Sequence, residues 1–294
     1  MVVRLSSWVV AAFLLFGGIA FGTVVACDTS APGSNLNSFG GTPSDGCAEI
    51  DKSFTNLTVT GTVGGAPGTG AIFIYANGTP PVGNTIGPVS LIFNTQGNSW
   101  SVSNGASMSE TIGYQLTANT GGTYSGGTYP IPSTPGLIWA IDQIVLTPNI
   151  SITNFGGGTS NTATITLAFC LSATTTSGCS PSHNGMIVAN YAGTTTAAYT
   201  CTFSGCVSGS SNTINLTGPI TQIAFSESLS LSAATPTGNT VTINQIANQF
   251  GEFAASPVAE PATRLLVGVG LISLDMERLK VGRVKKSYQK NTFS

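Results

Sequence analysis

Hydrophobic and polar residues alternate with a period of two along most of the chain. In residues 57–63, the apolar side chains of Leu57 and Val59 alternate with threonines, which is typical of a strand with one buried face. Segments of the same character recur at 71–76, 89–94, 100–103, 111–117, 138–146, 150–155, 163–171, 186–191, 198–203, 223–233 and 240–246. Between an N-terminal apolar run and Val258, no stretch has a helical period. The pattern predicts an all-β fold, an antiparallel β-sandwich or jelly roll.

Turns rich in glycine and asparagine join the expected strands. Asn77-Gly78 has the residue types of a two-residue hairpin turn. Residues 95–98 read Thr-Gln-Gly-Asn and predict a second hairpin, and residues 237–239 predict a third between the last two strands. These turns indicate strands that pair with their neighbours in sequence.

An apolar run near the N-terminus has the organisation of a secretion signal. Arg4 precedes an apolar stretch that ends in Val-Val-Ala at Ala26, where small residues favour cleavage. We expect a signal helix within residues 1–26 and a cut between Ala26 and Cys27. Two alternatives stay open. The run is long enough for a retained membrane helix, and Val-Val-Ala-Cys is similar to a lipobox, which would place a lipid on Cys27.

A second apolar segment, near the C-terminus, is followed by positive charges. Residues 265–274 would extend about 15 Å as a helix, about half of a hydrocarbon core. Six basic residues follow: Arg278, Lys280, Arg283, Lys285, Lys286 and Lys290. Extension of the helix to residue 284 takes in charges that cost about 2.5–3.5 kcal/mol each at mid-bilayer. We therefore expect a short apolar helix as a marginal membrane segment, with the basic tail cytoplasmic and the body facing outward.

The residues before this segment form a motif, Val258-Ala259-Glu260-Pro261-Ala262-Thr263. The motif, the apolar run and the basic tail occupy residues 257–290, and together they resemble the PEP-CTERM sorting signal of exported bacterial envelope proteins. Ala259 stands where the family has its first proline, and Arg264 where it has an apolar residue. The resemblance implies signal peptidase and an exosortase-type protease as processing partners. An ordinary amphipathic tail helix is the alternative.

The chain has six cysteines, at Cys27, Cys47, Cys170, Cys179, Cys201 and Cys206. An even number in an exported chain indicates disulfides, although six cysteines allow fifteen pairings. Pairing of sequence neighbours gives Cys27–Cys47, Cys170–Cys179 and Cys201–Cys206 in an oxidising compartment. A disulfide at Cys27 keeps the count even, so we favour it over the lipid. No Cys-x-x-Cys motif is present, and we expect neither a metal site nor a cofactor.

The region between the two signals, residues 27–256, is long enough for one disulfide-clipped domain with a sizeable core. Its only basic residue is Lys52, against eight acidic residues. Because nucleic-acid binding rests on Lys and Arg that neutralise phosphates, this composition excludes nucleic acid as a partner. The surface must consist largely of Ser, Thr, Asn and Gly.

Residues suited to catalysis are few. His183 is the only histidine and lies in a turn sequence, and no Gly-x-Ser-x-Gly elbow is present. We therefore expect no nucleophile with an adjacent base, and no catalytic residues. Glycoside hydrolysis needs two carboxylates about 5–10 Å apart. Glu110, Asp142 and Glu227 qualify by residue type alone.

Two further groups have both a functional and a structural interpretation. Trp100 and Trp139 suit a sugar-stacking platform if exposed beside a carboxylate, but strand tryptophans more often belong to the core. Asp45, Glu49 and Asp51 have the residue types of a weak calcium site. We favour a solvated loop for these three acids, with Asp51 paired in the neighbourhood of Lys52.

The sequence thus predicts a non-catalytic protein that is exported to the cell envelope or released outside the cell. Its expected role is structural or adhesive, in the cell surface or the exopolysaccharide layer. Its expected partners are the two processing proteases, the membrane and exopolysaccharide. The alternative is a carbohydrate-binding or carbohydrate-active β-sandwich protein.

Overall fold

Strands make up almost all of the regular structure. The computed structural model describes residues 23–39, 45–63, 72–95, 100–154, 160–235 and 237–257. Within these ranges the only helix is one 3₁₀ turn, η1 (Leu36–Phe39), and no helix has the length and apolarity needed to cross a bilayer. The predicted all-β class is confirmed. Residues 1–22 of the predicted signal helix, the C-terminal apolar helix, the sorting motif and the basic tail lie outside the described residues.

Eight strands form the first sheet. Their order is β1 (Val24–Ala26), β3 (Gly46–Glu49), β4 (Lys52–Val63), β8 (Ser107–Ala118), β16 (Gln222–Ser232), β12 (Thr162–Leu171), β13 (Asn184–Ala192) and β14 (Ala198–Thr202). The pair β1–β3 is parallel and the other pairs are antiparallel.

Seven strands form the second, antiparallel sheet. Six of them follow the order β15 (Thr213–Ile220), β11 (Ile138–Thr153), β17 (Thr240–Ala255), β6 (Val89–Thr95), β5 (Ile72–Asn77) and β2 (Ser34–Asn35). The seventh, β7 (Ser101–Ser103), pairs with β17. A separate two-stranded ribbon consists of β9 (Thr123–Tyr124) and β10 (Gly127–Thr128).

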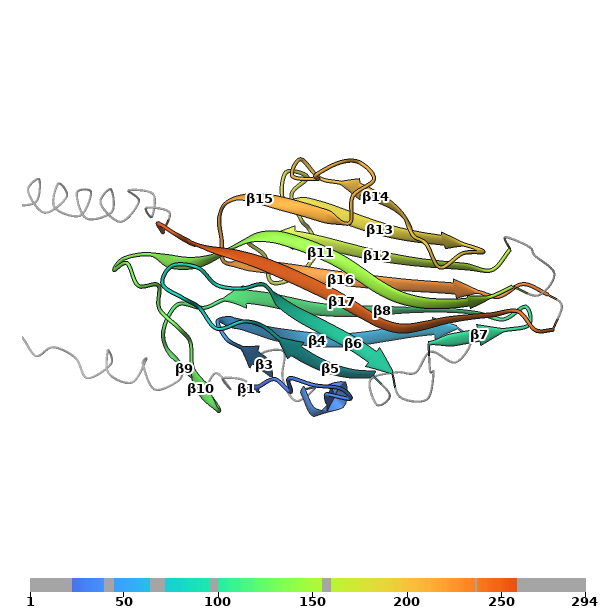
Figure 1. Ribbon diagram of the computed structural model, residues 1–294, viewed down its shortest axis with the longest axis horizontal. Coiled ribbons are helices and arrows are strands. Elements are labelled where there is room, and N and C mark those ends of the chain that lie inside the picture. The colour runs from blue at the N-terminus through green and yellow to red at the C-terminus, as the bar shows by residue number, and fades with distance from the viewer. Residues whose placement is uncertain are drawn as a thin grey trace, which may run out of the picture. The chain divides into compact units, whose positions relative to one another are not determined.

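The two sheets pack face to face as layers of a sandwich (Figure 1). Phe250 of β17 contacts Phe54 of β4, with ring centroids 6.1 Å apart, and Phe225 of β16, at 5.4 Å. Since β17 belongs to the second sheet and its two contacts to the first, these rings join the layers. Along β16, Leu229 and Leu231 are buried while the serines beside them face outward. The period of two in the sequence therefore sorts side chains between core and surface.

Strand β17 organises the second sheet. It pairs with β11 along its whole length. Its other edge pairs with β7 at residues 240–242 and with β6 at residues 245–250. The hairpin predicted at residues 95–98 is therefore wrong, because β6 and β7 pair end to end with the longer β17 rather than with each other.

The other two predicted hairpins also differ from the structure. β5 and β6 pair as expected, but residues 78–88 connect them, so Asn77-Gly78 is not a two-residue turn. β16 and β17 lie in different sheets, because both edges of β16 are already paired, with β8 and β12.

Two segments that the sequence separates form a single strand. Residues 138–146 and the start of 150–155 join in β11, through Pro148 and a register shift at Asn149/Ile150. Proline is tolerated in a sheet where one edge of the strand lacks a partner. β15 pairs only with residues 141–145 of β11, and Pro148 lies beyond that contact.

The folded body begins before Cys27. Strand β1 (Val24–Ala26), expected within the secretion signal, pairs with β3. The backbone N–H of Thr23 donates to Asp45 Oδ1 at 2.7 Å, and that of Ala26 donates to the carbonyl of Ser125 at 3.1 Å. Cleavage between Ala26 and Cys27 would remove these bonds together with the strand. The expected boundary at residue 26 thus lies at the end of strand β1.

Three disulfides connect the cysteines as neighbours in sequence, Cys27–Cys47, Cys170–Cys179 and Cys201–Cys206. The predicted pairing is confirmed. Such bonds persist in oxidising surroundings, which indicates an extracellular or periplasmic location. Because the Sγ of Cys27 is bonded to Cys47, that sulfur cannot carry the lipid of the lipobox alternative.

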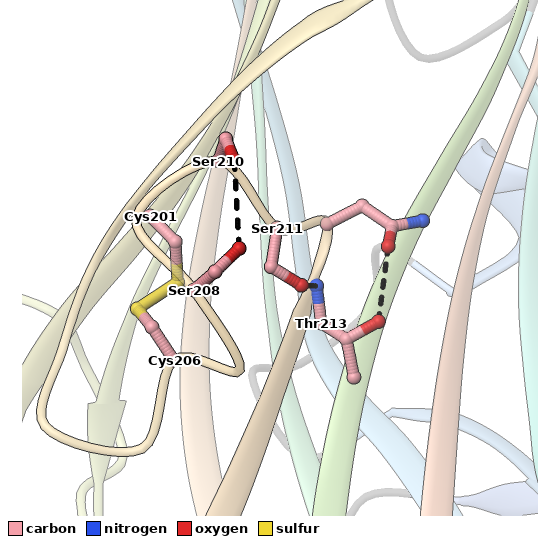
Figure 2. Close-up of a disulfide and its surroundings, with 7 residues drawn as sticks. Cys201, Cys206, Ser208, Ser210, Ser211 and Thr213 are labelled. Atoms are coloured by element: carbon pink, nitrogen blue, oxygen red, sulfur yellow. Dashed lines mark hydrogen bonds between the residues drawn. A yellow bond between two sulfur atoms is a disulfide. The ribbon is translucent and has the colours of Figure 1, made fainter.

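The third disulfide closes a serine-rich loop between β14 and β15 (Figure 2). Ser211 Oγ accepts a hydrogen bond from the backbone N–H of Thr213 at 3.0 Å, and Thr213 Oγ1 donates to Asn212 Oδ1 at 3.0 Å. The hydroxyl oxygens of Ser208 and Ser210 are 3.5 Å apart. Short-range polar contacts and one covalent bond thus hold this loop, together with the packing of Phe203 on Phe169.

A carboxyl group is buried between the sheets. Glu227 of β16 is 0% exposed, and Asn248 of β17 donates to its Oε2 at 2.7 Å and to the hydroxyl of Tyr114 at 3.0 Å. Burial raises the pKa of Glu227 to about 8, although the hydrogen bond from Asn248 lowers it. Glu227 is therefore mostly neutral at pH 7 in the folded protein and ionised in the unfolded chain.

Replacement of Glu227 by Gln should remove part of the pH dependence of stability. Because the pKa of Glu227 rises from 4.5 to about 8 on folding, its stabilising contribution is complete below pH 4.5 and is lost as pH rises through 8. The loss amounts to as much as about 5 kcal/mol. Urea unfolding at about pH 4.5 and pH 8.5 should show a larger loss of stability for the wild type than for Glu227→Gln. Equal losses in the two proteins would contradict a neutral buried acid.

Removal of the disulfides should destabilise the protein in the order of their sequence separations, which are 20, 9 and 5 residues. The chain-entropy relation gives about 3 kcal/mol for Cys27–Cys47 and about 2 kcal/mol for Cys201–Cys206. Double Ser variants, compared by denaturant unfolding, should follow this order. A larger loss for the third pair than for the first would show that loop closure does not govern the effect.

Candidate functional site

The two strand tryptophans belong to the core. Trp100 and Trp139 are both 0% exposed. Trp100 Nε1 donates to Glu110 Oε1 at 3.2 Å, and Trp139 Nε1 donates to the carbonyl of Pro130 at 3.1 Å. Each indole N–H thus has a partner inside the protein, as buried tryptophans require. Neither ring is available to stack on a sugar.

The carboxyl groups considered for glycoside chemistry do not form a surface pair. Glu110 and Glu227 lie on adjacent strands but point inward, 2% and 0% exposed. Asp142 lies on β11, in the other sheet, where burial raises its pKa and Lys52 lowers it. A substrate in solution has no access to Glu110 or Glu227, so the geometry does not support the hydrolase alternative.

The acidic residues near Cys47 separate in the structure. Asp45 accepts a hydrogen bond from Thr23, Glu49 lies on β3, and Asp51 is fully buried. The expected solvation is therefore wrong for Asp51, but its expected pairing with Lys52 is present, at 3.2 Å. In the ranges that the structure describes, no three His, Cys, Asp or Glu side chains are placed to hold a metal ion. His183 is exposed in a turn, as expected.

The outer face of the eight-stranded sheet carries an array of hydroxyl groups, and we call it the hydroxyl face. It consists of Thr58, Thr60, Ser107, Ser109, Thr111, Thr162, Thr164, Thr166, Ser226, Ser228, Ser230 and Ser232. Each of these residues is at least partly exposed, and on β8, β12 and β16 they alternate with buried residues. The face therefore spans four adjacent strands, β4, β8, β16 and β12.

Strand pairing aligns these hydroxyls in rows. The rows are Thr60–Thr111–Ser228–Thr166, then Ser109–Ser230–Thr164, then Ser107–Ser232–Thr162. Neighbouring strands are about 4.8 Å apart and successive outward residues about 7 Å apart, so the hydroxyls form a two-dimensional lattice. Thr111 Oγ1 and Ser228 Oγ are 3.1 Å apart and share a hydrogen bond. The lattice follows from serine or threonine at alternate positions of paired strands.

The hydroxyl face carries no charge. The two ionisable residues in the matching stretches of β8, β12 and β16, Glu110 and Glu227, point into the core. Lys52, the only Lys or Arg among the described residues, is also buried. Each hydroxyl can both donate and accept a hydrogen bond. This arrangement suits a neutral ligand that is rich in hydroxyl groups, and it offers no electrostatic attraction to a charged one.

A hollow of about 380 Å³ lies at one side of the face. Its lining includes Thr58, Thr111 and Ser226, and Thr174–Thr176 of the loop between β12 and β13. The Cys170–Cys179 disulfide closes this loop. Gly113 lies in the same hollow, and a Cβ there would meet Thr58 Oγ1 at 2.5 Å. The disulfide therefore holds one wall of the hollow, and a residue without a side chain forms part of its floor.

Serine has no adjacent base on this face. The only histidine lies in a turn, and the nearest carboxyls point inward, so the hydroxyls are not activated as nucleophiles. The hydroxyl face can therefore offer hydrogen bonds to a ligand. The sequence contained the signal, serine or threonine at every second position of 107–111, 162–166 and 226–232, but gave no indication that these strands are neighbours.

No family model matches the chain, and no curated protein matches it.

Proposed function

We propose that this protein is an exported, non-catalytic component of the cell envelope that adheres to neutral polysaccharide through the hydroxyl face. One observation carries the proposal: the broad outer face of the eight-stranded sheet is a regular, uncharged array of hydroxyls. Three disulfides support a location outside the cytoplasm. The burial of both tryptophans and of Glu110 and Glu227 supports adhesion rather than hydrolysis.

The energetics of such a face favour a polymer over a single sugar. Each hydrogen bond to a hydroxyl replaces one to water, so its net contribution is only about 0.5–1.5 kcal/mol. A polysaccharide chain can engage successive rows at once, and the repeated contacts add through effective concentration. The expected binding is weak for a monosaccharide and strong for a long chain or a surface.

The C-terminal stretch provides the route to the envelope in this proposal. The motif at Val258–Thr263, the apolar run and the basic tail resemble a PEP-CTERM signal, which an exosortase-type protease would read. The leader would end before Thr23, because Thr23 and strand β1 make backbone bonds within the body. Ala20 and Gly22 supply small residues for a cut at that point.

Charged residues placed on the hydroxyl face should abolish adhesion. In Thr111→Lys with Ser228→Lys, two long cations occupy the central row, break the Thr111–Ser228 bond and hold their own water. Retention on neutral polysaccharide, measured by pull-down and glycan array, should weaken at least about tenfold, the effect of losing one or two net hydrogen bonds. Both residues are partly exposed, so the fold should persist.

The matched control is Thr147→Lys, the same change at an exposed position of β11 in the other sheet. It should bind as the wild type does. Equal binding by all three proteins, or no binding by the wild type to any neutral polysaccharide, would exclude the hydroxyl face as the adhesive surface. Circular dichroism of each variant separates loss of binding from loss of fold.

Replacement of Glu260 and Pro261 by Ala should block C-terminal processing. The motif would no longer match the sorting signal, while the described body ends at Pro257 and is untouched. Mass spectrometry of cell fractions should find residues 265–294 still attached and less protein at the cell surface. The control is Thr240→Ser, a mild change inside the body. Unchanged processing and display in the double variant would contradict the sorting proposal.

A further inference from the structure

A lysine and two carboxyl groups are enclosed between the sheets, away from the hydroxyl face. Lys52 Nζ lies 3.2 Å from Asp51 Oδ1 and 2.9 Å from Glu252 Oε2, and all three side chains are 0% exposed. Asp51 and Lys52 lead into β4 of the first sheet, whereas Glu252 lies on β17 of the second. The contact between Lys52 and Glu252 therefore crosses from one layer to the other.

The two contacts of Lys52 differ in geometry. Lys52 Nζ donates a hydrogen bond to Asp51 Oδ1. Its 2.9 Å approach to Glu252 Oε2 does not have the direction of a hydrogen bond, and neither oxygen of Glu252 has a hydrogen-bond partner. A buried carboxylate without hydrogen bonds is costly as an anion. The amine nitrogen is thus held at contact distance from a buried carboxyl group.

Burial favours the neutral form of Glu252. If Lys52, Asp51 and Glu252 were all ionised, a net negative charge would remain among side chains that are fully buried. Burial raises the pKa of Glu252 well above its ordinary value, Lys52 opposes the rise and Asp51 adds to it.

We propose that Lys52 and Glu252 condense into an intramolecular amide bond, with Asp51 moving the proton. Nζ of Lys52 first passes one proton to the carboxylate of Glu252, and its freed lone pair then attacks Cδ of Glu252, forming the N–C bond. Asp51 accepts the proton that leaves nitrogen and delivers it to a hydroxyl on Cδ, whose C–O bond breaks to release one water. Amine and acid become amide and water, Asp51 is regenerated, and no oxidant or other reactant is needed.

The site holds the two reacting groups in contact and away from solvent, which does not happen for free amines and acids in water. Groups held at contact distance react with effective molarities of about 10⁵–10⁸ M. Exclusion of water limits the reverse hydrolysis. Glu252 is the acceptor rather than Asp51, since Asp51 receives a hydrogen bond from Nζ and is adjacent in the chain to Lys52. An amide to Glu252 would join two positions 200 residues apart and tie β17, the last strand, covalently to β4.

The sequence offers a direct test with trypsin, which cleaves after Lys and Arg but not after an acylated Lys. Lys52 is the only such residue between Arg4 and Arg264. Full-length protein from an oxidising compartment, reduced and denatured, should therefore resist cleavage at residue 52. Its intact mass should be lower by one water than that of the same polypeptide without the amide. A second digest should yield a branched peptide that joins Lys52 to Glu252.

Two variants at the site and one control variant test the assignment of the amide. Lys52→Arg keeps the positive charge but lacks the amine, so trypsin should cut it completely at residue 52 in the same denaturant. Asp51→Asn removes the proton carrier at nearly constant volume and should leave full mass and a cleavable Lys52. Glu227→Gln, a change at a buried acid without an amine beside it, should lose water as the wild type does. Cleavage of the wild type at Lys52 with full mass, or an amide to Asp51 in place of Glu252, would overturn the proposal.

Discussion

The contact between β17 and the opposite sheet is the interaction on which the rest of the structure depends. β17 pairs with β11, β6 and β7 within its own sheet, and its inward side chains reach β4 and β16 in the other. Phe250 packs on aromatic rings of both strands, while Asn248 and Glu252 contact the acid and the lysine buried there. Without this strand the two layers would lose their central apolar and polar contacts together.

The packing of two sheets also determines where the few ionisable side chains lie. The carboxyls of Glu110, Glu227 and Glu252 lie on inward positions, where Trp100, Asn248 and Lys52 respectively contact them. Because Glu110 and Glu227 point inward, the hydroxyl face of the first sheet carries no charge. Burial of these carboxyl groups costs folding free energy unless each one is neutral or paired. The neutral outer face and the polar interior are two consequences of one strand pattern.

The disulfides fix three short segments of chain, and several of their cysteines are themselves buried at the core. Cys27–Cys47 ties the segment after β1 to β3, Cys170–Cys179 closes the loop beside the hollow, and Cys201–Cys206 closes the serine-rich loop. Each bond spans a short stretch of chain and can form without the rest of the topology. That locality explains why pairing by sequence order was correct for the cysteines but wrong for the hairpins at 95–98 and 237–239, where the partner strands are distant in sequence.

The sequence by itself determined the β class, most strand positions, the disulfide pairing and the alternation that puts Thr111 or Ser228 outside and Leu229 inside, because these depend on local spacing. Only the tertiary structure decided which strands are neighbours, that Val24–Ala26 belong to the body, and that Trp100 and Asp51 are buried. It also brought Lys52 against Glu252 and aligned the hydroxyls into rows. These features depend on contacts between residues far apart in the chain. The alternation of polar and apolar residues within a strand does not specify which distant strand it pairs with.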